Sequence, residues 1–140
     1  MGILSFKLGE YDVALEQLER AGAVCMEVFG LEHTLTAANL QHQARLHKTV
    51  GRLDLAQTLL EKSVQAYTAA SGSDTPNIAG VYVDLAQIHD ILGNTNGANT
   101  LYARAVKILS AQLPPEHTAT IHVKEEYRLF LERAGLQALE

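Results

Sequence analysis

Six histidines and a single cysteine are the residues of this chain best suited to metal binding or nucleophilic chemistry. Two metal ligands on one face of a helix need a spacing of four residues, as in helical zinc sites. His42 precedes His47 by five residues and His117 precedes His122 by five, so neither pair has that spacing. Cys25 has no second cysteine with which to form a disulfide or a Cys-x-x-Cys pair. The sequence therefore predicts no metal site.

The sequence also lacks the other local patterns that catalysis or cofactor binding requires. It contains no glycine-rich loop suited to a phosphate group and no motif that places a nucleophile beside a base. Cys25 lies in an apolar pattern, without the electropositive surroundings that activate a thiol. We therefore expect no cofactor, no catalytic residues and no enzymatic activity.

The composition fits a single folded domain and disfavours several classes of function. Of the 140 residues, 47% are apolar and 19% are charged, which is enough apolar surface for a buried core. The 16 acidic residues outnumber the 11 basic ones, so a protein that holds nucleic acid by its phosphates is not expected. No apolar run approaches the ~20 residues that cross a bilayer, and the N-terminus lacks the features of a signal peptide. We expect a soluble, cytoplasmic protein with no nucleic-acid or membrane partner.

The elements that position these residues follow a repeat of 42 residues. Gly9, Gly51, Gly93 and Gly135 are separated by that distance. Small or apolar residues recur 5, 9, 12 and 16 residues after each of the first three glycines, which places them on one face of a helix. A second apolar stripe, which begins at Val13 in the first repeat, predicts that each of these helices packs between two neighbours.

A break about 21 residues after each glycine divides the repeat into two helices. Glycine or proline stops one helix at the break, and an acidic residue followed by a capping residue starts the next. We predict an all-α fold of helical hairpins in one domain, with no strand. The expected helices span about 10–29, 34–49, 52–71, 76–92, 94–112 and 117–134. The repeat units cover about 9–50, 51–92 and 93–134, with partial helices at 1–8 and 135–140.

Most side chains that are able to bind a ligand have a structural role in this repeat. His33 and His117 occupy equivalent positions at the breaks, where we expect them to link or cap helices. His47 and His89 also share a position, which suits a half-buried ring with a polar tip. Cys25 is expected to be a small core residue. Four tyrosines are likewise expected to pack in the core: Tyr67, Tyr82, Tyr102 and Tyr127.

The repeat resembles the tetratricopeptide repeat family, whose helix pairs carry a small residue late in the first helix and a glycine at the turn. Tyr11 follows Gly9 as the aromatic residue of that turn, and Ala44 and Ala86 fill the small site. The 42-residue period and the loop at 31–34 resemble the kinesin light chain subgroup, which has a longer second helix. The resemblance covers essentially the whole chain and implies an α-solenoid of antiparallel helical hairpins coiled into a superhelix.

In the tetratricopeptide family, the first helix of each pair lines a concave groove that binds a segment of a partner protein. The resemblance therefore implies a non-enzymatic scaffold with a protein or peptide partner. The charge of the implied groove runs from basic at Arg45 and Lys48 to acidic at its other end, which is complementary to a peptide with the opposite distribution. The groove residues that the resemblance implies are Gln41, His42, Arg45, Lys48, Val83, Asp84, Gln87, Asp90, Glu125, Glu126 and Leu129.

The two ends of the chain leave alternatives open. Lys124 and Arg128 replace apolar and small residues of the preceding repeats, so the last helix either caps the array with a polar face or packs in a shifted way. Both ends resemble parts of helix pairs, which indicates an excerpt from a longer array. The alternative function is self-association into a homo-oligomer, in which the open ends stack on a second copy. The apolar residues that favour stacking are Ile3, Phe6, Leu136 and Leu139.

Overall fold

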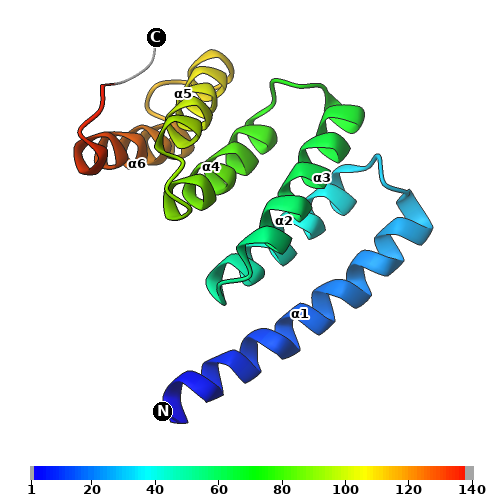
Figure 1. Ribbon diagram of the computed structural model, residues 1–140. Helices are drawn as coiled ribbons and strands as arrows, with labels where there is room; N and C mark the ends of the chain where they lie inside the picture. The colour runs from blue at the N-terminus through cyan, green and yellow to red at the C-terminus, as the bar shows by residue number, and fades with distance from the viewer. Residues whose placement is uncertain (1, 138–140) are drawn as a thin grey trace. The chain divides into compact units, whose positions relative to one another are not determined.

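The protein is described here by a computed structural model, which defines the backbone of residues 2–137 and the side chains of residues 9–137 (Figure 1). No strand occurs in residues 2–137, so the all-α prediction is confirmed. The six α-helices in this range are α1 (Gly2–Phe29), α2 (Thr34–Thr49), α3 (Leu53–Ser71), α4 (Pro76–Ile91), α5 (Thr95–Gln112) and α6 (Thr118–Ala134).

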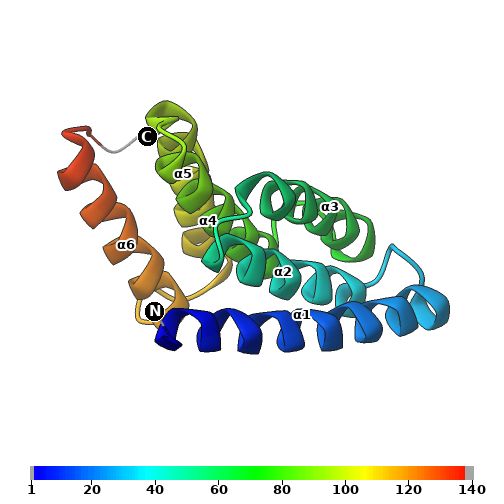
Figure 2. The ribbon, with the colours of Figure 1, turned by 60° about the horizontal axis from the view of Figure 1, so that its bottom comes forward.

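The helices form two compact units, and each is described by itself. Unit 1 is Met1–Ser71 and holds α1, α2 and α3, with α2 packed against both of the others (Figure 2). Unit 2 is Gly72–Glu140 and holds α4, α5 and α6, with α5 packed against both of the others. We call α2, α4 and α6 the A-type helices, because each precedes a glycine of the 42-residue series, and α1, α3 and α5 the B-type helices.

Glycines of the repeat end all three A-type helices in the same way. Gly51, Gly93 and Gly135 have φ angles of 88°, 84° and 67°, a left-handed conformation that a residue without a Cβ adopts at little cost. In each case the next residue donates its backbone N–H to a carbonyl in the last turn, as Arg52 does to the His47 oxygen at 2.8 Å. The same glycine C-cap thus recurs every 42 residues, which gives the sequence repeat a structural basis.

Side chains at the breaks cap the N-termini of the A-type helices. The His33 Nδ1 accepts a hydrogen bond from the Leu35 N–H at 3.0 Å, and the His117 Nδ1 accepts one from the Ala119 N–H at 3.1 Å. Thr75, at the equivalent position before α4, caps that helix through its hydroxyl. The prediction that His33 and His117 have capping roles is confirmed, because each satisfies a donor that the helix leaves open.

The core of unit 1 is built around alanines at the hairpin of α2 and α3. Ala37, Ala44 and Ala56 are fully buried, so the two helices approach closely. The Ser63 hydroxyl donates a hydrogen bond to the Ala37 carbonyl oxygen at 2.8 Å. On the other side of α2, the Asn39 side chain donates to the Leu18 carbonyl oxygen of α1 at 2.9 Å.

The core of unit 2 contains an aromatic cluster. The ring centroids of Tyr102 and Phe130 lie 5.0 Å apart, and those of Tyr102 and Tyr127 lie 5.7 Å apart. The Tyr127 hydroxyl donates a hydrogen bond to the Asn99 side-chain oxygen. Tyr67, Tyr82, Tyr102 and Tyr127 are all buried, which confirms their predicted role in packing.

The predicted break between residues 1–8 and the next helix is wrong. Residues 2–29 form one continuous helix, and Gly9 is not among the glycines with a positive φ angle. Glycine adopts the right-handed helical conformation as readily as the left-handed one, and no proline near Gly9 forces a stop. The glycine therefore ends a helix at Gly51 and Gly93 but not at Gly9.

The prediction that every B-type helix packs on two faces is also wrong for α1. Val13 and Val24, from its second apolar stripe, are 56% and 57% exposed. The repeat equivalents of Val24, Ala66 and Ile108, are 1% and 5% exposed in helices that pack closely against α2 and α4, whereas Leu55, the equivalent of Val13 in α3, is also 53% exposed. Within unit 1, α1 packs mainly against α2, so its second apolar face stays largely exposed. For the same reason Cys25, predicted to be a core residue, is only half-buried.

Candidate peptide-binding surface

The residues predicted to line a peptide groove lie on the three A-type helices, and their exposure differs along the chain. On α2, His42 and Arg45 are exposed, Lys48 is half-buried and Gln41 is buried. Because Arg45 and Lys48 are one turn apart on the same helix face, α2 presents a basic surface.

On α4, the predicted residues range from buried to half-buried. Val83 and Asp84 are 7% and 6% exposed, and both therefore contribute little accessible surface. Gln87 and Asp90 are half-buried. The accessible part of the predicted surface on α4 thus lies toward its C-terminal end.

Two side-chain contacts bring the predicted faces of α4 and α6 together in unit 2. The Gln87 side-chain amide donates a hydrogen bond to the Glu126 Oε1 at 2.7 Å. The Asp90 carboxylate forms an ion pair with Arg133, with 3.3 Å between nitrogen and oxygen. Four residues from two helices therefore share one surface. Three of them, Gln87, Asp90 and Glu126, are among the predicted groove residues.

One carboxylate oxygen of Glu126 accepts a hydrogen bond, and the other does not. Its Oε1 accepts the hydrogen bond from Gln87, whereas its Oε2 is buried and has no hydrogen-bond partner among the described residues. A carboxylate oxygen without a donor is costly, so a donor that reaches it stabilises the protein. Burial raises the pKa of the neighbouring Tyr102 hydroxyl, and the Glu126 and Asp90 carboxylates raise it further.

The outer face of α6 is charged, as one of the two predicted arrangements requires. Arg128 is exposed and pairs with Glu125 and Glu132, with nitrogen–oxygen distances of 2.5 Å to each. Its hydrogen bonds lower the pKa of the Glu125 carboxyl. The equivalent residues Ala44 and Ala86 are fully buried. Leu129, also predicted for the groove, is 45% exposed beside this network.

Among the side chains that the structure describes, none are arranged to hold a metal ion. In residues 9–137, no group of three or more histidine, cysteine or acidic side chains is close enough to hold an ion. His33 and His117 are helix caps, and the His89 ring is hydrogen-bonded to the Asn94 side chain at 3.1 Å. The described helices also include none that is long and apolar enough to span a bilayer.

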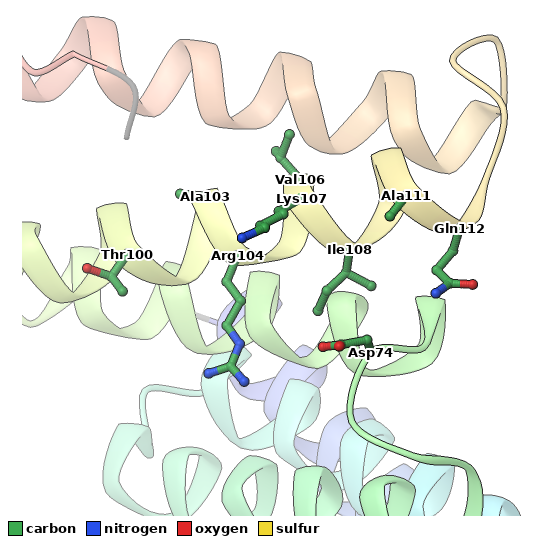
Figure 3. A pocket seen from close by; sticks show the side chains of 9 residues that line it. All are labelled: Asp74, Thr100, Ala103, Arg104, Val106, Lys107, Ile108, Ala111 and Gln112. Carbon is green, nitrogen blue, oxygen red and sulfur yellow. The ribbon is translucent and has the colours of Figure 1, made fainter. Parts of the chain in front are cut away.

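The sequence analysis missed a surface hollow of about 740 Å³ along α5 (Figure 3). Figure 3 shows Asp74 beside Gln112 at one end of the hollow and Thr100 at the other. Arg104 and Lys107 add positive charge, and the Arg104 guanidinium lies 4.8 Å from the centre of the Tyr82 ring. A basic residue recurs at the Arg104 position in the other B-type helices, as Arg20 and Lys62. This repeated positive charge is the sequence feature that could have drawn attention to the α5 surface.

The stability of the protein is expected to fall at acidic pH because of His47. Its side chain is 7% exposed, and its Nδ1 has no hydrogen-bond partner among the described residues. Burial lowers the pKa of His47 below 6.5, and nearby Arg52 lowers it further, although Glu19 acts in the opposite direction. As the pH falls through 6.5, the unfolded chain takes up the proton first, so the free energy of unfolding decreases until the folded-state pKa is passed.

The measurement is urea unfolding at pH 8 and pH 5, for the natural chain and for His47→Leu. Leucine occupies the equivalent position in α6, as Leu131, so the substitution suits this position in the repeat. The variant should lose less stability than the natural chain between the two pH values, because the other five histidines are common to both. An unchanged pH dependence would show that His47 titrates alike in the folded and unfolded chains.

Comparison with known proteins decides the family. A model of the tetratricopeptide repeat matches residues 1–69 and again residues 41–111. The chain belongs to the tetratricopeptide repeat family. Proteins of this family are in general non-enzymatic scaffolds for protein interactions. A search of curated protein sequences finds no match.

Solved structures with the same fold include kinesin light chain-like proteins. A putative kinesin light chain from Podosopora anserina with nearly identical TPR-like repeats is 24% identical, with a TM-score of 0.77, over 92% of this chain and 61% of that one. BtubC (BKLC) from P. vanneervenii is 18% identical, with a TM-score of 0.80, over 91% of this chain and 51% of that one. These neighbours confirm the predicted solenoid of tetratricopeptide-like hairpins. The chain spans about half to three-fifths of their length.

Proposed function

We propose that this tetratricopeptide repeat chain binds a peptide segment of a partner protein on the faces of its A-type helices. The observation that carries the proposal is the pair of contacts that joins α4 and α6, Gln87 to Glu126 and Asp90 to Arg133. They place residues from two repeats on one polar surface, and a peptide that spans several residues needs such a surface.

Charge suggests which peptides this surface prefers. On α4 and α6, Asp90, Glu125 and Glu126 make the surface acidic, which favours a ligand with basic side chains. On α2, Arg45 and Lys48 favour carboxylates. We therefore propose that the surface of α4 and α6 prefers peptides with lysine or arginine residues and that the face of α2 prefers peptides with acidic residues, since complementary charge governs specificity and association rate.

The test is selection from a peptide library displayed on phage, with the immobilised 140-residue chain as bait. Arg45→Glu/Lys48→Glu should weaken binding of selected peptides with acidic residues at least about tenfold, or about 1.4 kcal/mol. The matched control is Lys62→Glu/Lys107→Glu, which changes the net charge equally but alters exposed residues of B-type helices. Asp90→Asn/Glu126→Gln should selectively weaken peptides with basic residues.

Two outcomes would contradict the proposal. Equal losses for the A-type variant and its control would mean that net charge alone attracts the peptides. Enrichment that is unchanged by the two A-type variants but lost in the control would place the binding site on the B-type helices, for example at the α5 hollow that Lys107 lines.

A further inference from the structure

The loop between α1 and α2 and the helix ends beside it carry a cluster of exposed apolar side chains. Two come from the last turn of α1, one from the loop and one from the first turn of α2: Met26, Phe29, Leu31 and Leu35, which are 48%, 45%, 42% and 51% exposed. We call these four residues the loop cluster. A single exposed apolar side chain is ordinary, but a group of large ones on a short segment is typical of an interaction site.

Contacts across the loop hold the ends of the two helices together. The Phe29 and His33 rings are stacked, with 4.4 Å between their centroids. The Thr36 hydroxyl donates a hydrogen bond to the Gly30 carbonyl oxygen at 2.7 Å, and the Gly30 N–H donates one to the Met26 carbonyl oxygen at 3.0 Å. The loop cluster is therefore ordered before a partner arrives, so little conformational entropy is lost on binding.

The repeat does not require apolar residues at these positions. At the next break, polar residues occupy all four equivalent positions: Thr68, Ser71, Ser73 and Asn77. They are exposed, although a hairpin lies on each side of this break in the chain. At the last break the equivalent residues are Ser110, Leu113, Pro115 and Ala119, and none of them is buried. Stacking of repeats therefore does not bury these positions, and the apolar character of the loop cluster has another cause.

A hollow of about 230 Å³ between α1 and α2 adjoins the loop cluster, because Met26 lines it together with Gly22 and Leu40. Typical small-molecule sites occupy about 300–1,000 Å³, so this hollow suits one anchoring side chain and not a whole cofactor. Thr36 and Asn39 also line it, and both already donate hydrogen bonds to backbone carbonyl oxygens. An apolar side chain is therefore the best fit.

The charge around the loop cluster is acidic. Glu19 lines the hollow, and Glu27 and Glu32 each lie one residue after a member of the loop cluster. All three side chains are exposed, and none of them forms an ion pair within residues 9–137. No lysine or arginine occurs in residues 21–44. A partner with basic residues beside its apolar ones is therefore complementary.

We propose that the loop cluster binds an amphipathic helix of a partner protein, with lysine or arginine residues beside the apolar face of that helix. The loop cluster offers apolar side chains, against which an extended peptide would leave backbone groups unpaired, whereas a helix satisfies its own. One apolar side chain of the partner fills the hollow, and its basic residues approach Glu27 and Glu32. The proposal is independent of peptide binding by the A-type faces, because no member of the loop cluster is among the predicted groove residues.

Fluorescence anisotropy with a labelled helical probe tests the proposal. The probe is a synthetic peptide of about 18 residues, with leucine and lysine arranged in the helical period and long enough to be helical when bound. The 140-residue chain should bind it. A second peptide, with glutamate in place of every lysine, should bind at least about tenfold more weakly.

Phe29→Ser/Leu31→Ser should weaken binding of the lysine probe at least about tenfold. Serine occupies both equivalent positions at the next break, so the substitutions suit the fold. The matched control is Val24→Ser/Val28→Ser, which removes two exposed apolar side chains from another face of α1 and should leave binding unchanged. Circular dichroism should show equal helix content in the natural chain and in both variants.

Charge gives a second readout that leaves the apolar side chains in place. Glu27→Gln/Glu32→Gln should weaken the lysine probe about threefold. Glu61→Gln/Glu116→Gln changes the net charge equally at exposed positions elsewhere and should have no effect. Three results would overturn the proposal: no binding of the lysine probe, equal losses for the loop-cluster variant and the valine control, or equal losses for the two pairs of glutamate variants.

Discussion

Ala56→Arg is expected to unfold the hairpin of α2 and α3. Ala56 is fully buried, and its equivalent Ala98 in unit 2 is fully buried as well. An arginine there must either carry its charge into the core or push the two helices apart. Either result costs about 4 kcal/mol or more of the free energy of unfolding, a large part of the total stability of a small domain.

Hydrogen exchange followed by mass spectrometry measures this loss, because it resolves the α2–α3 hairpin from unit 2. Protection of residues 34–71 should disappear in Ala56→Arg. Gln65→Arg is the matched control, since Gln65 is exposed on the same helix and its replacement should change stability by less than about 0.5 kcal/mol. Similar protection in both variants would show that the column of alanines does not set the helix spacing.

Gly22→Val is expected to separate α1 from α2 and to cost about 2 kcal/mol. A Cβ at Gly22 would lie 2.5 Å from the Asn39 Oδ1 and 3.0 Å from the Gln43 Nε2. Asn39 has little freedom to move, because its Nδ2 donates to the Leu18 carbonyl oxygen and its Oδ1 accepts from Gln43. Urea unfolding, with hydrogen exchange of residues 9–49, measures the effect.

The repeat supplies a rescue for this variant. The positions of Gly22 and Asn39 are occupied in α5 and α6 by Val106 and Val123, so two valines are accepted where these helices meet. Gly22→Val/Asn39→Val should therefore recover most of the stability that Gly22→Val loses. A double variant as unstable as the single one would mean that the clash with Asn39 is not the cause.

The sequence was sufficient for the fold wherever a local signal determined the structure. The ends of five helices agree with the prediction to within one residue, because glycine stops and side-chain caps act over a few residues. Gly9 was the exception, since a glycine permits a left-handed stop without requiring one. The exposure of Val13 and Val24 was also missed. A repeat pattern indicates which face of a helix is apolar, but it does not indicate whether another helix covers that face.

The candidate surface was less predictable than the fold. The family positions identified Gln87 and Glu126, and the structure places them in contact. They also included Val83 and Asp84, which are buried, because exposure depends on side chains of neighbouring helices that no spacing rule describes. The hollow along α5 was missed for a related reason, since all of its lining residues except Asp74 belong to α5, a B-type helix that the resemblance assigns to packing.

The caps and stops at the ends of each helix also determine where the chain tolerates insertions. A residue added inside α3 would rotate everything that follows it in the helix by about 100°, moving Ser63 and Ala66 off the face that meets α2. A residue added between Gly72 and Thr75 would change no helix, because Thr75 starts α4 anew whatever precedes it. Changes in length should therefore accumulate in the short loops over evolution, while the angular order of faces along each helix stays the same.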